Sequence, residues 1–349
     1  MSCAARSRKR VAVVGAGVVG LNAALEIQRR LPGCDVTVIA DKFNGETLSD
    51  GAAGLFRPDT YIFGPDVQTS RKWVKDSYSF YKNLLDKKDV DGPYGINSVS
   101  GYAFTSKDPS FIMNHYMEHC APNYRDATEE ELSMHSETKS KIINGIFCTS
   151  IVIECKRFLP WALKMITDNG GTIVKRKIES LEELCKDYDI VFNCTGYAAK
   201  KLCKDYNMTP IRGQVIRVKA PWVDKFYYYD GDTYIIPSKE DGTVVLGGCR
   251  HFGSNNETAN DRNTEEILEN CVRLVPSLRE ALKTDYSVWV GLRPYRNQIR
   301  IEIETINGTA IVHNYGHGGY GVTLAPGTSK HAVDLLISYL QTEAASTSE

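Results

Sequence analysis

Residues 11–41 read VAVVGAGVVGLNAALEIQRRLPGCDVTVIAD, and this stretch decides the fold class of the chain. Four apolar residues typical of a β-strand run into the glycine-rich segment Gly15 to Gly20, and the apolar residues after it recur at helical spacing. A second apolar strand, Val36 to Ala40, then ends in Asp41. The stretch therefore predicts a strand, a tight glycine turn, a helix and a second strand, which is the building unit of dinucleotide-binding α/β folds.

Each glycine of the turn has a physical task in such a fold. Gly15 makes the turn, Gly17 lets the backbone approach a pyrophosphate, and Gly20 lets the helix pack on the strand. The free N–H groups at the helix N-terminus then face the diphosphate. Asp41 lies 21 residues after Gly20, where an acid accepts hydrogen bonds from an adenosine ribose and disfavours a 2′-phosphate. We therefore expect a bound dinucleotide, and a glycine-rich turn without a ligand is the alternative.

Size and charge narrow the class of protein. At 349 residues the chain is long enough for two cores, and its 42% hydrophobic and 24% charged residues are typical of a globular protein. The 42 basic and 43 acidic residues give a net charge of -1, so no bulk field attracts nucleic acid or anionic lipid. No apolar run has the 18 or so residues that a membrane span needs.

The cysteines and the two ends of the chain bear on its compartment. The ten cysteines include no C-x-x-C pair and are expected to be reduced thiols, which indicates an intracellular location. The N-terminal MSCAARSRKR has no separate apolar core, which argues against a signal peptide. The final AASTSE lacks the S-K-L type ending that addresses proteins to peroxisomes.

The alternation of strand and helix is interrupted once. It stops near residue 60 and resumes near residue 150, and residues 211–248 read almost wholly as strands of an antiparallel sheet. Asn144-Gly145 lies between two β-prone runs and predicts a hairpin turn. We predict a Rossmann-like dinucleotide-binding domain that is discontinuous, interleaved with an α+β substrate domain that contains the antiparallel sheet. The first domain takes residues 1–60, 150–205 and 290–349, and the second takes residues 61–149 and 206–289.

Taken without family knowledge, the residues supply a dinucleotide site but no obvious general base. Strands of the second domain contribute Tyr234, Arg250 and Arg296, while the sequence has neither a GxSxG nor an HExxH motif. His313 and His317 are the histidines nearest the C-terminal glycine-rich loop. For both of them, a structural role is the alternative to a catalytic one.

Several motifs together resemble one family. They are VAVVGAGVVGL, VTVIAD, SDGAAGLFRP, NCTG, GLRPYRNQIRIE and HNYGHGGYGVT, and from about residue 11 to residue 340 the chain is similar to the D-amino acid oxidase and D-aspartate oxidase family of flavoproteins. The resemblance implies that the dinucleotide is FAD.

The resemblance also implies the residues that hold FAD. Beside Gly15 and Gly20 of the turn, the matching positions at the diphosphate and the adenosine are Ala16, Gly17, Val18, Val19, Asp41, Lys42, Thr47 and Ser49. Those along the flavin and the rest of the nucleotide are Gly54, Leu55, Ile178 and Thr195. The loop that faces the pyrimidine edge of the flavin is matched by Gly318, Gly319, Tyr320, Gly321, Val322 and Thr323.

In the substrate pocket, the resemblance assigns Arg296 to the α-carboxylate, Tyr234 to its support, and the carbonyl of Gly319 to the amino group. The implied reaction is hydride transfer from the Cα of a D-amino acid to flavin N5, followed by reoxidation with O2 to hydrogen peroxide. The imino acid hydrolyses to a 2-oxo acid and ammonia. No catalytic acid or base side chain is required, because the protein needs only to align Cα–H with the flavin.

Two features bear on the substrate. The short segment 226–233 resembles the loop of D-aspartate oxidases, and Arg250 stands where those enzymes have an arginine and the neutral-substrate oxidases an apolar residue. Arg57, near the active site in relatives, would add a second donor. We therefore expect D-aspartate or D-glutamate as substrate.

Other interpretations stay open at this stage. They are an oxidase of neutral D-amino acids with an aromatic pocket from Tyr227 to Tyr229, an NAD-dependent dehydrogenase, and a non-catalytic nucleotide-binding module. A homodimer is a possible assembly, and the family suggests peroxisomes, with the cytoplasm as the alternative. No metal is expected.

Overall fold

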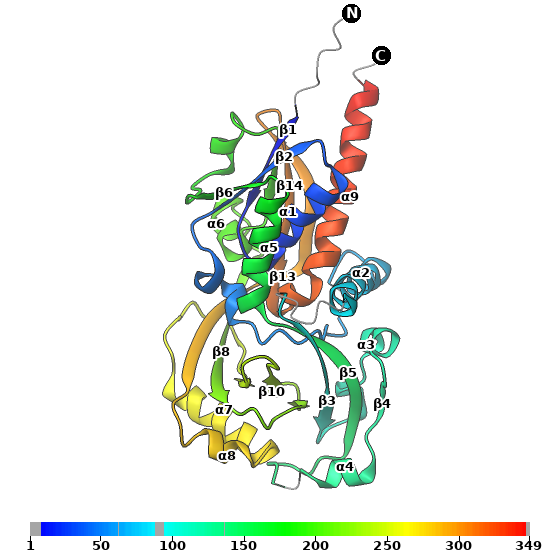
Figure 1. The fold of residues 1–349 in the computed structure, drawn as a ribbon, viewed down its shortest axis with the longest axis vertical. Coiled ribbons are helices and arrows are strands. Elements are labelled where there is room, and N and C mark those ends of the chain that lie inside the picture. The colour runs from blue at the N-terminus through cyan, green and yellow to red at the C-terminus, as the bar shows by residue number, and fades with distance from the viewer. Residues whose placement is uncertain (1–7, 62, 88–93, 136, 347–349) are drawn as a thin grey trace, which may run out of the picture.

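The computed structural model describes residues 8–61, 63–87, 94–135 and 137–346. Residues 1–7 and 347–349, on which the predictions about a leader and a targeting signal partly rest, lie outside the described residues. Figure 1 shows helices and parallel strands in the upper half of the molecule and a broad antiparallel sheet in the lower half.

The predicted strand–turn–helix unit forms as expected. Five strands run parallel in the order β6-β2-β1-β7-β14, and their bounds are β6 Thr172–Lys175, β2 Cys34–Ala40, β1 Lys9–Val14, β7 Ile190–Asn193 and β14 Thr309–His317. Strands β1, β7 and β14 are buried along most or all of their length, as strands covered on both faces must be. The carboxyl end of β1 therefore opens into the glycine turn at the edge where ligands bind in such sheets.

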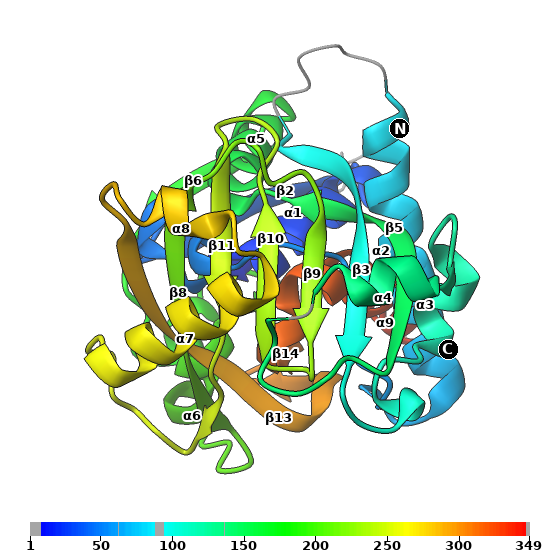
Figure 2. The same cartoon turned by 90° about the horizontal axis from the view of Figure 1, so that it is seen from below.

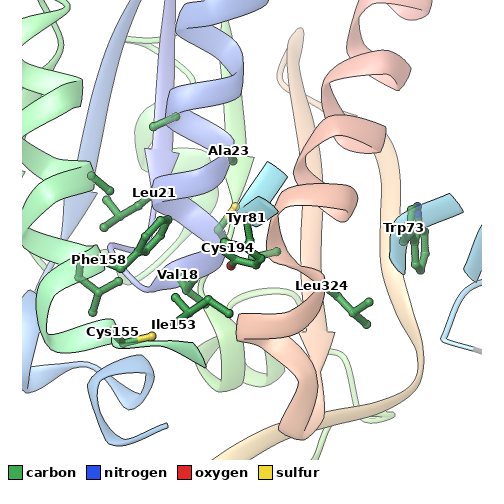
Figure 3. Close-up of a cluster of buried hydrophobic side chains, with 14 of the residues drawn as sticks. Val18, Leu21, Ala23, Trp73, Tyr81, Ile153, Cys155, Phe158, Cys194 and Leu324 are labelled. Carbon is green, nitrogen blue, oxygen red and sulfur yellow. The ribbon is translucent and has the colours of Figure 1, made fainter. Parts of the chain in front are cut away.

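Three long helices cover this sheet: α1 Val18–Arg30, α5 Cys155–Asp168 and α9 Gly321–Ser346, with α1 packed against both others. Leu21, Phe158 and Leu324 are fully buried and, one on each helix, belong to a single apolar cluster (Figure 3). Burial of such side chains contributes about 1.5–3 kcal/mol each, so the packing fixes where α1 and α9 begin.

The remaining strands form the antiparallel sheet that Figure 2 shows from below, with α7 and α8 across its face. Its strands are β4 Arg125–Asp126, β5 Asn144–Ile153, β3 Ile96–Thr105, β9 Phe226–Tyr229, β10 Thr233–Pro237, β11 Thr243–Gly247, β8 Thr209–Lys219 and β12 His251–Phe252. Its pairs are antiparallel except β3 with β9. The other helices are α2 Val67–Asp86, α3 His115–Cys120, α4 Glu129–Ser133, α6 Ala199–Leu202, α7 Asp261–Leu274 and α8 Leu278–Ala281.

One long strand, β13 Ser287–Ile306, joins the two halves. Its first half pairs with β8 and its second half with β14, and the pairing with β14 shifts register between Tyr295 and Arg300. The segment RPYR lies where these two pairings meet. The α/β fold with an antiparallel sheet is thus confirmed. None of the helices in the described part of the chain has the length and apolar character of a membrane span.

The predicted hairpin at Asn144-Gly145 is wrong, because both residues belong to the single strand β5. A Cβ on Gly145 would lie 2.7 Å from the Phe104 ring on β3, so the glycine makes room for a neighbouring ring instead of making a turn.

The predicted domain division stays a prediction, with one complication. Helix α2 was assigned to the substrate domain, yet it packs against α9: the Tyr81 hydroxyl donates to the carbonyl of Val322 at 2.6 Å, and the backbone of Gly327 lies against Trp73. A boundary at residue 61 therefore separates two helices that pack together.

Candidate active site

A cavity of about 790 Å³ lies where the two halves of the fold meet. It is lined by the turn after β1, by Tyr228 and Tyr234, and by the middle of β13. This volume is within the range of small-molecule and cofactor sites.

The glycine turn is built as the sequence predicts. Gly15 has φ +108°, and a Cβ there would lie 2.5 Å from the carbonyl oxygen of Cys194. A Cβ on Gly20 would lie 1.9 Å from the carbonyl oxygen of Gly15, so the missing side chain lets the helix pack closely on the turn. At Gly17 the sole close neighbour of a Cβ, in the part of the chain that the structure describes, is the Ser49 hydroxyl at 3.1 Å, which leaves the backbone exposed to the cavity.

The N-terminus of α1 is prepared for an anion. Its N-cap, Gly17, has no side chain to cap the helix, and the first turn carries no acid. The Val18 N–H donates to Ser49 Oγ at 3.0 Å, which leaves the Ser49 proton free to point elsewhere. The unpaired N–H groups and the dipole of a helix N-terminus favour a phosphate at this place.

A second helix begins at the same cavity. The short helix η6 Gly318–Tyr320 leads into α9, whose first turn also has no acidic residue. The residues around this junction line the cavity, so two helix N-termini face one ligand site.

Almost all the predicted cofactor residues line the cavity. They are Gly15, Ala16, Gly17, Val18, Val19, Asp41, Lys42, Thr47, Ser49, Gly54, Leu55, Thr195, Gly318, Gly319, Tyr320, Gly321, Val322 and Thr323. Gly20 and Ile178 do not line it: Gly20 packs on the turn, and Ile178 is buried in an apolar cluster with Leu181 and Val191.

Of the predicted substrate residues, Tyr234, Arg250, Gly319 and Arg57 line the cavity, but Arg296 does not. Its Nε donates to Asp205 Oδ2 at 3.0 Å and its Nη1 to the carbonyl of Gln298 at 2.9 Å. The prediction that Arg296 faces the substrate is therefore not supported by the structure. The reason is strand geometry, because successive side chains on β13 point to opposite faces.

Arg293 of the same RPYR segment occupies the cavity instead. Its Nη1 donates to the carbonyl of Cys249 at 3.1 Å, and its guanidinium lies over Gly213, where a Cβ would come within 2.3 Å of Nη1. Burial raises the pKa of the nearby Tyr234 hydroxyl to about 12, opposed by the charge of Arg293, so this hydroxyl is a neutral donor near neutral pH.

Two further arginines line the cavity, and they differ in whether an acidic residue lies beside them. Arg250 lies 3.7 Å from Asp232 Oδ1 and donates to the carbonyl of Gly231 at 3.4 Å. Arg57 has its Cζ 4.6 Å from the centre of the Tyr228 ring, and within the described residues it forms neither a hydrogen bond nor an ion pair. A half-buried guanidinium without an acidic partner is a site prepared for an anion.

The sequence did not point to Asn314 or Cys249, which also line the cavity, whereas Tyr228 belongs to the aromatic segment named for the neutral-substrate alternative. Asn314 is fully buried, and among the described residues its Oδ1 has no hydrogen-bond donor. A buried acceptor without a partner costs free energy, so a ligand that donates a hydrogen bond here would be stabilised. The cavity, the two helix N-termini and this acceptor together fit a dinucleotide cofactor.

The family model described as "FAD dependent oxidoreductase" matches residues 10–335. The chain belongs to this family of FAD-dependent oxidoreductases. It is 37% identical to "D-aspartate oxidase" of Homo sapiens, over 94% of each chain. It is 33% identical to "D-amino acid oxidase" of Dugesia ryukyuensis, over 95% of this chain and 98% of that one.

Solved structures support the fold of this FAD-dependent oxidoreductase. Glycine oxidase from Bacillus cereus ATCC 14579 superposes with a TM-score of 0.73 at 20% identity, over 95% of each chain. Glycine oxidase from Geobacillus kaustophilus gives a TM-score of 0.75 at 17% identity, also over 95% of each. The cofactor of the protein is FAD, which settles the choice against a nicotinamide cofactor.

Proposed function

We propose that this protein catalyses the FAD-dependent oxidative deamination of D-amino acids and prefers acidic ones, D-aspartate or D-glutamate. The products are the 2-oxo acid, ammonia and hydrogen peroxide, with O2 as the second substrate. The likeness to D-aspartate oxidase supports the reaction. The observation that carries the preference is that Arg57, Arg250 and Arg293 all line one cavity, and of these only Arg250 has an acidic partner, Asp232, among the described residues.

Arg293 is the proposed partner of the α-carboxylate. Its guanidinium donates to the Cys249 carbonyl and lies directly over Gly213, so its remaining N–H groups have a fixed direction. A planar guanidinium binds a carboxylate through two parallel hydrogen bonds, which orients the substrate as well as binding it. The neutral Tyr234 hydroxyl would donate a further hydrogen bond.

Arg57 and Arg250 are the proposed partners of the side-chain carboxylate. Arg250 already has Asp232 at 3.7 Å, whereas Arg57 has the face of Tyr228 as its contact. An acidic substrate would supply the counter-charge that Arg57 lacks, and a neutral substrate would leave a partly desolvated cation unpaired. Arg57 is therefore expected to contribute more to the preference than Arg250.

The chain's role in the reaction is positioning. The Gly319 carbonyl is proposed to accept from the substrate amine, and Arg293 to hold the carboxylate, so that the Cα–H of a D-enantiomer is directed at the flavin. Tyr61, Tyr228 and Tyr320 also line the cavity and would limit the access of water. When bound, FAD would supply the hydride-accepting chemistry and the link to O2 as oxidant. No side chain is needed as a general acid or base.

The FAD contacts are proposed from the same cavity. The N-terminus of α1 with Gly17 and Ser49 would hold the diphosphate, Asp41 the adenosine ribose, and the start of α9 the flavin ring. The second helix N-terminus would place positive potential where reduction adds negative charge.

A second candidate is an oxidase of neutral D-amino acids. It is favoured by the aromatic wall of the cavity, where the rings of Tyr228 and Tyr234 lie 5.5 Å apart. Comparison of kcat/KM over a panel of D-amino acids decides between the two. A higher value for D-aspartate or D-glutamate than for D-alanine supports the first proposal, and the reverse order overturns it.

We also propose a reducing, intracellular location, with peroxisomes suggested by family resemblance and the cytoplasm as the alternative. All nine cysteines in the described part of the chain are free thiols, which supports a reducing compartment. Localisation of a tagged full-length chain, with the tag at the N-terminus, tests it. A homodimer is the proposed assembly, to be tested by light scattering of the holoenzyme.

A further inference from the structure

A chain of hydrogen bonds runs from the cofactor cavity to the surface. The Thr195 N–H and hydroxyl lie 3.3 and 2.7 Å from Asn193 Oδ1, and Asn193 Nδ2 lies 3.1 Å from His313 Nδ1. The other ring nitrogen of His313, Nε2, lies 3.0 Å from Glu304 Oε1. Asn193 and His313 are fully buried, whereas Thr195 lines the cavity and Glu304 is 42% exposed at its side chain.

The direction of every bond in this chain is fixed by chemistry. The Thr195 N–H is a donor only, so the Asn193 amide must turn its oxygen toward Thr195. The amide nitrogen then faces His313 and donates to Nδ1, which must be unprotonated. The neutral ring therefore carries its proton on Nε2 and donates to the Glu304 carboxylate.

The same direction fixes the Thr195 hydroxyl. The hydroxyl donates its proton to Asn193 Oδ1, so toward any other group it can act only as a hydrogen-bond acceptor. In the described part of the chain this hydroxyl has no other hydrogen-bond partner, and its residue lines the cavity next to the turn, where a Cβ on Gly15 would lie 3.5 Å from Thr195 Cα.

We propose that Thr195 is held as a hydrogen-bond acceptor toward FAD, and that Asn193 and His313 are positioning residues that set this polarity. A phosphate oxygen is itself an acceptor and cannot be the partner. The partner is therefore a donor of FAD, and the place beside the glycine turn points to a sugar or ribityl hydroxyl adjoining the diphosphate. Ser49, which accepts from Val18 and keeps its proton free, has the complementary role of donor to the diphosphate.

The first experiment compares Thr195→Val with Thr195→Ser. Holoenzyme is diluted and the FAD dissociation constant is measured from the flavin fluorescence released, with ADP as a competitor. We expect Thr195→Val to bind FAD roughly three- to tenfold more weakly, the effect of one hydrogen bond, and Thr195→Ser to stay within about twofold of wild type. Weaker competition by ADP in Thr195→Val places the partner in the ADP half of FAD, and unchanged competition places it in the flavin half. Wild-type FAD affinity in Thr195→Val overturns the proposal.

The second experiment separates positioning from packing at His313. Asn places a polar group near the Nδ1 position and can accept from Asn193, whereas Gln places its amide near Nε2 and reaches only Glu304. We expect His313→Asn to keep the FAD affinity and His313→Gln to lower it. Equal affinities, or the reverse order, overturn the positioning role.

A spectroscopic readout does not depend on those variants folding. The ring ¹⁵N shifts of histidine-labelled holoenzyme should show one neutral ring that carries its proton on Nε2 and none on Nδ1. This signal is assigned to His313 by its loss in whichever His313 variant folds, or by its perturbation in Thr195→Val. A proton on Nδ1 of that ring overturns the proposal.

Discussion

Arg293 and Arg296 lie three residues apart on β13, and their side chains point to opposite faces of the strand. The Arg293 guanidinium lines the cavity, while Arg296 binds Asp205 at 3.0 Å, and that carboxylate also accepts from the Tyr315 hydroxyl at 2.9 Å. One arginine is thus available to a substrate and the other is committed to the protein. The two can be separated by mutation.

Arg293→Ala should lower kcat/KM for every substrate by at least about a hundredfold, because an oriented guanidinium both binds the α-carboxylate and aligns the reacting carbon. FAD content should stay at the wild-type level. The measurement is peroxide production with D-aspartate and D-alanine.

The matched control for that prediction is Arg296→Ala. It leaves the buried Asp205 without its cation, so we expect a lower melting temperature and nearly normal kcat/KM in the protein that folds. If Arg296→Ala loses activity against all substrates and Arg293→Ala does not, the α-carboxylate is bound by Arg296 after all.

Arg57→Met should lower the ratio of kcat/KM for D-aspartate over D-alanine by roughly ten- to a thousandfold, the loss of one charge-assisted pair. Arg250→Met should lower it less, because Asp232 already neutralises part of that charge. Neither variant should change FAD content. An unchanged ratio in both variants would assign these arginines to the protein fold and favour the oxidase of neutral D-amino acids.

The sequence allowed the local part of this site to be predicted, because the information is local. Gly15, Gly20 and Asp41 follow from the spacing of one strand–turn–helix unit, and the turn has the geometry that this spacing requires. The choice between Arg293 and Arg296 was also within reach, since alternation along a strand separates them. The assignment of the α-carboxylate to Arg296 rested on the motif and did not use the alternation of side chains along the strand.

Other features depend on contacts between distant segments and left no sequence signal. The free guanidinium of Arg57 becomes informative only when Tyr228, on a strand far along the chain, is placed beneath it. Asn144-Gly145 shows the same limit. The dipeptide is typical of turns, but here it lies within a strand, where the glycine makes room for the ring of Phe104. The packing of α2 on α9 likewise joins segments about 250 residues apart.

Gly17→Ala should fold normally and weaken FAD binding. Among the described residues a Cβ there meets only the Ser49 hydroxyl, at 3.1 Å, but it projects where the proposed diphosphate approaches the backbone. We expect the FAD dissociation constant to rise at least about tenfold, measured by flavin release from diluted holoenzyme. Gly33→Ala is the control, because a Cβ at Gly33 meets no atom of the described residues within 4 Å and should not change FAD affinity. Equal FAD affinity in both variants would place the diphosphate elsewhere.

The last prediction concerns acid stability and rests on His317. Its ring is buried, with Nε2 3.0 Å from Thr328 Oγ1, and burial lowers its pKa to about 3. In the unfolded chain the pKa returns to about 6.5, so unfolding takes up a proton at any pH between these values. The neutral ring therefore adds its full stability above pH 6.5, and the contribution is lost as the pH falls toward 3.

The loss should have a slope of up to about 1.4 kcal/mol per pH unit in the free energy of unfolding. Urea unfolding at pH 7, 6 and 5, with a fixed excess of FAD, measures the slope. His317→Asn should reduce it by nearly one proton, while His251→Asn, which changes an exposed side chain, should leave it at the wild-type value. If His317→Asn keeps the wild-type slope between pH 6 and 5, His317 takes up its proton in the folded protein and the acid sensitivity originates elsewhere.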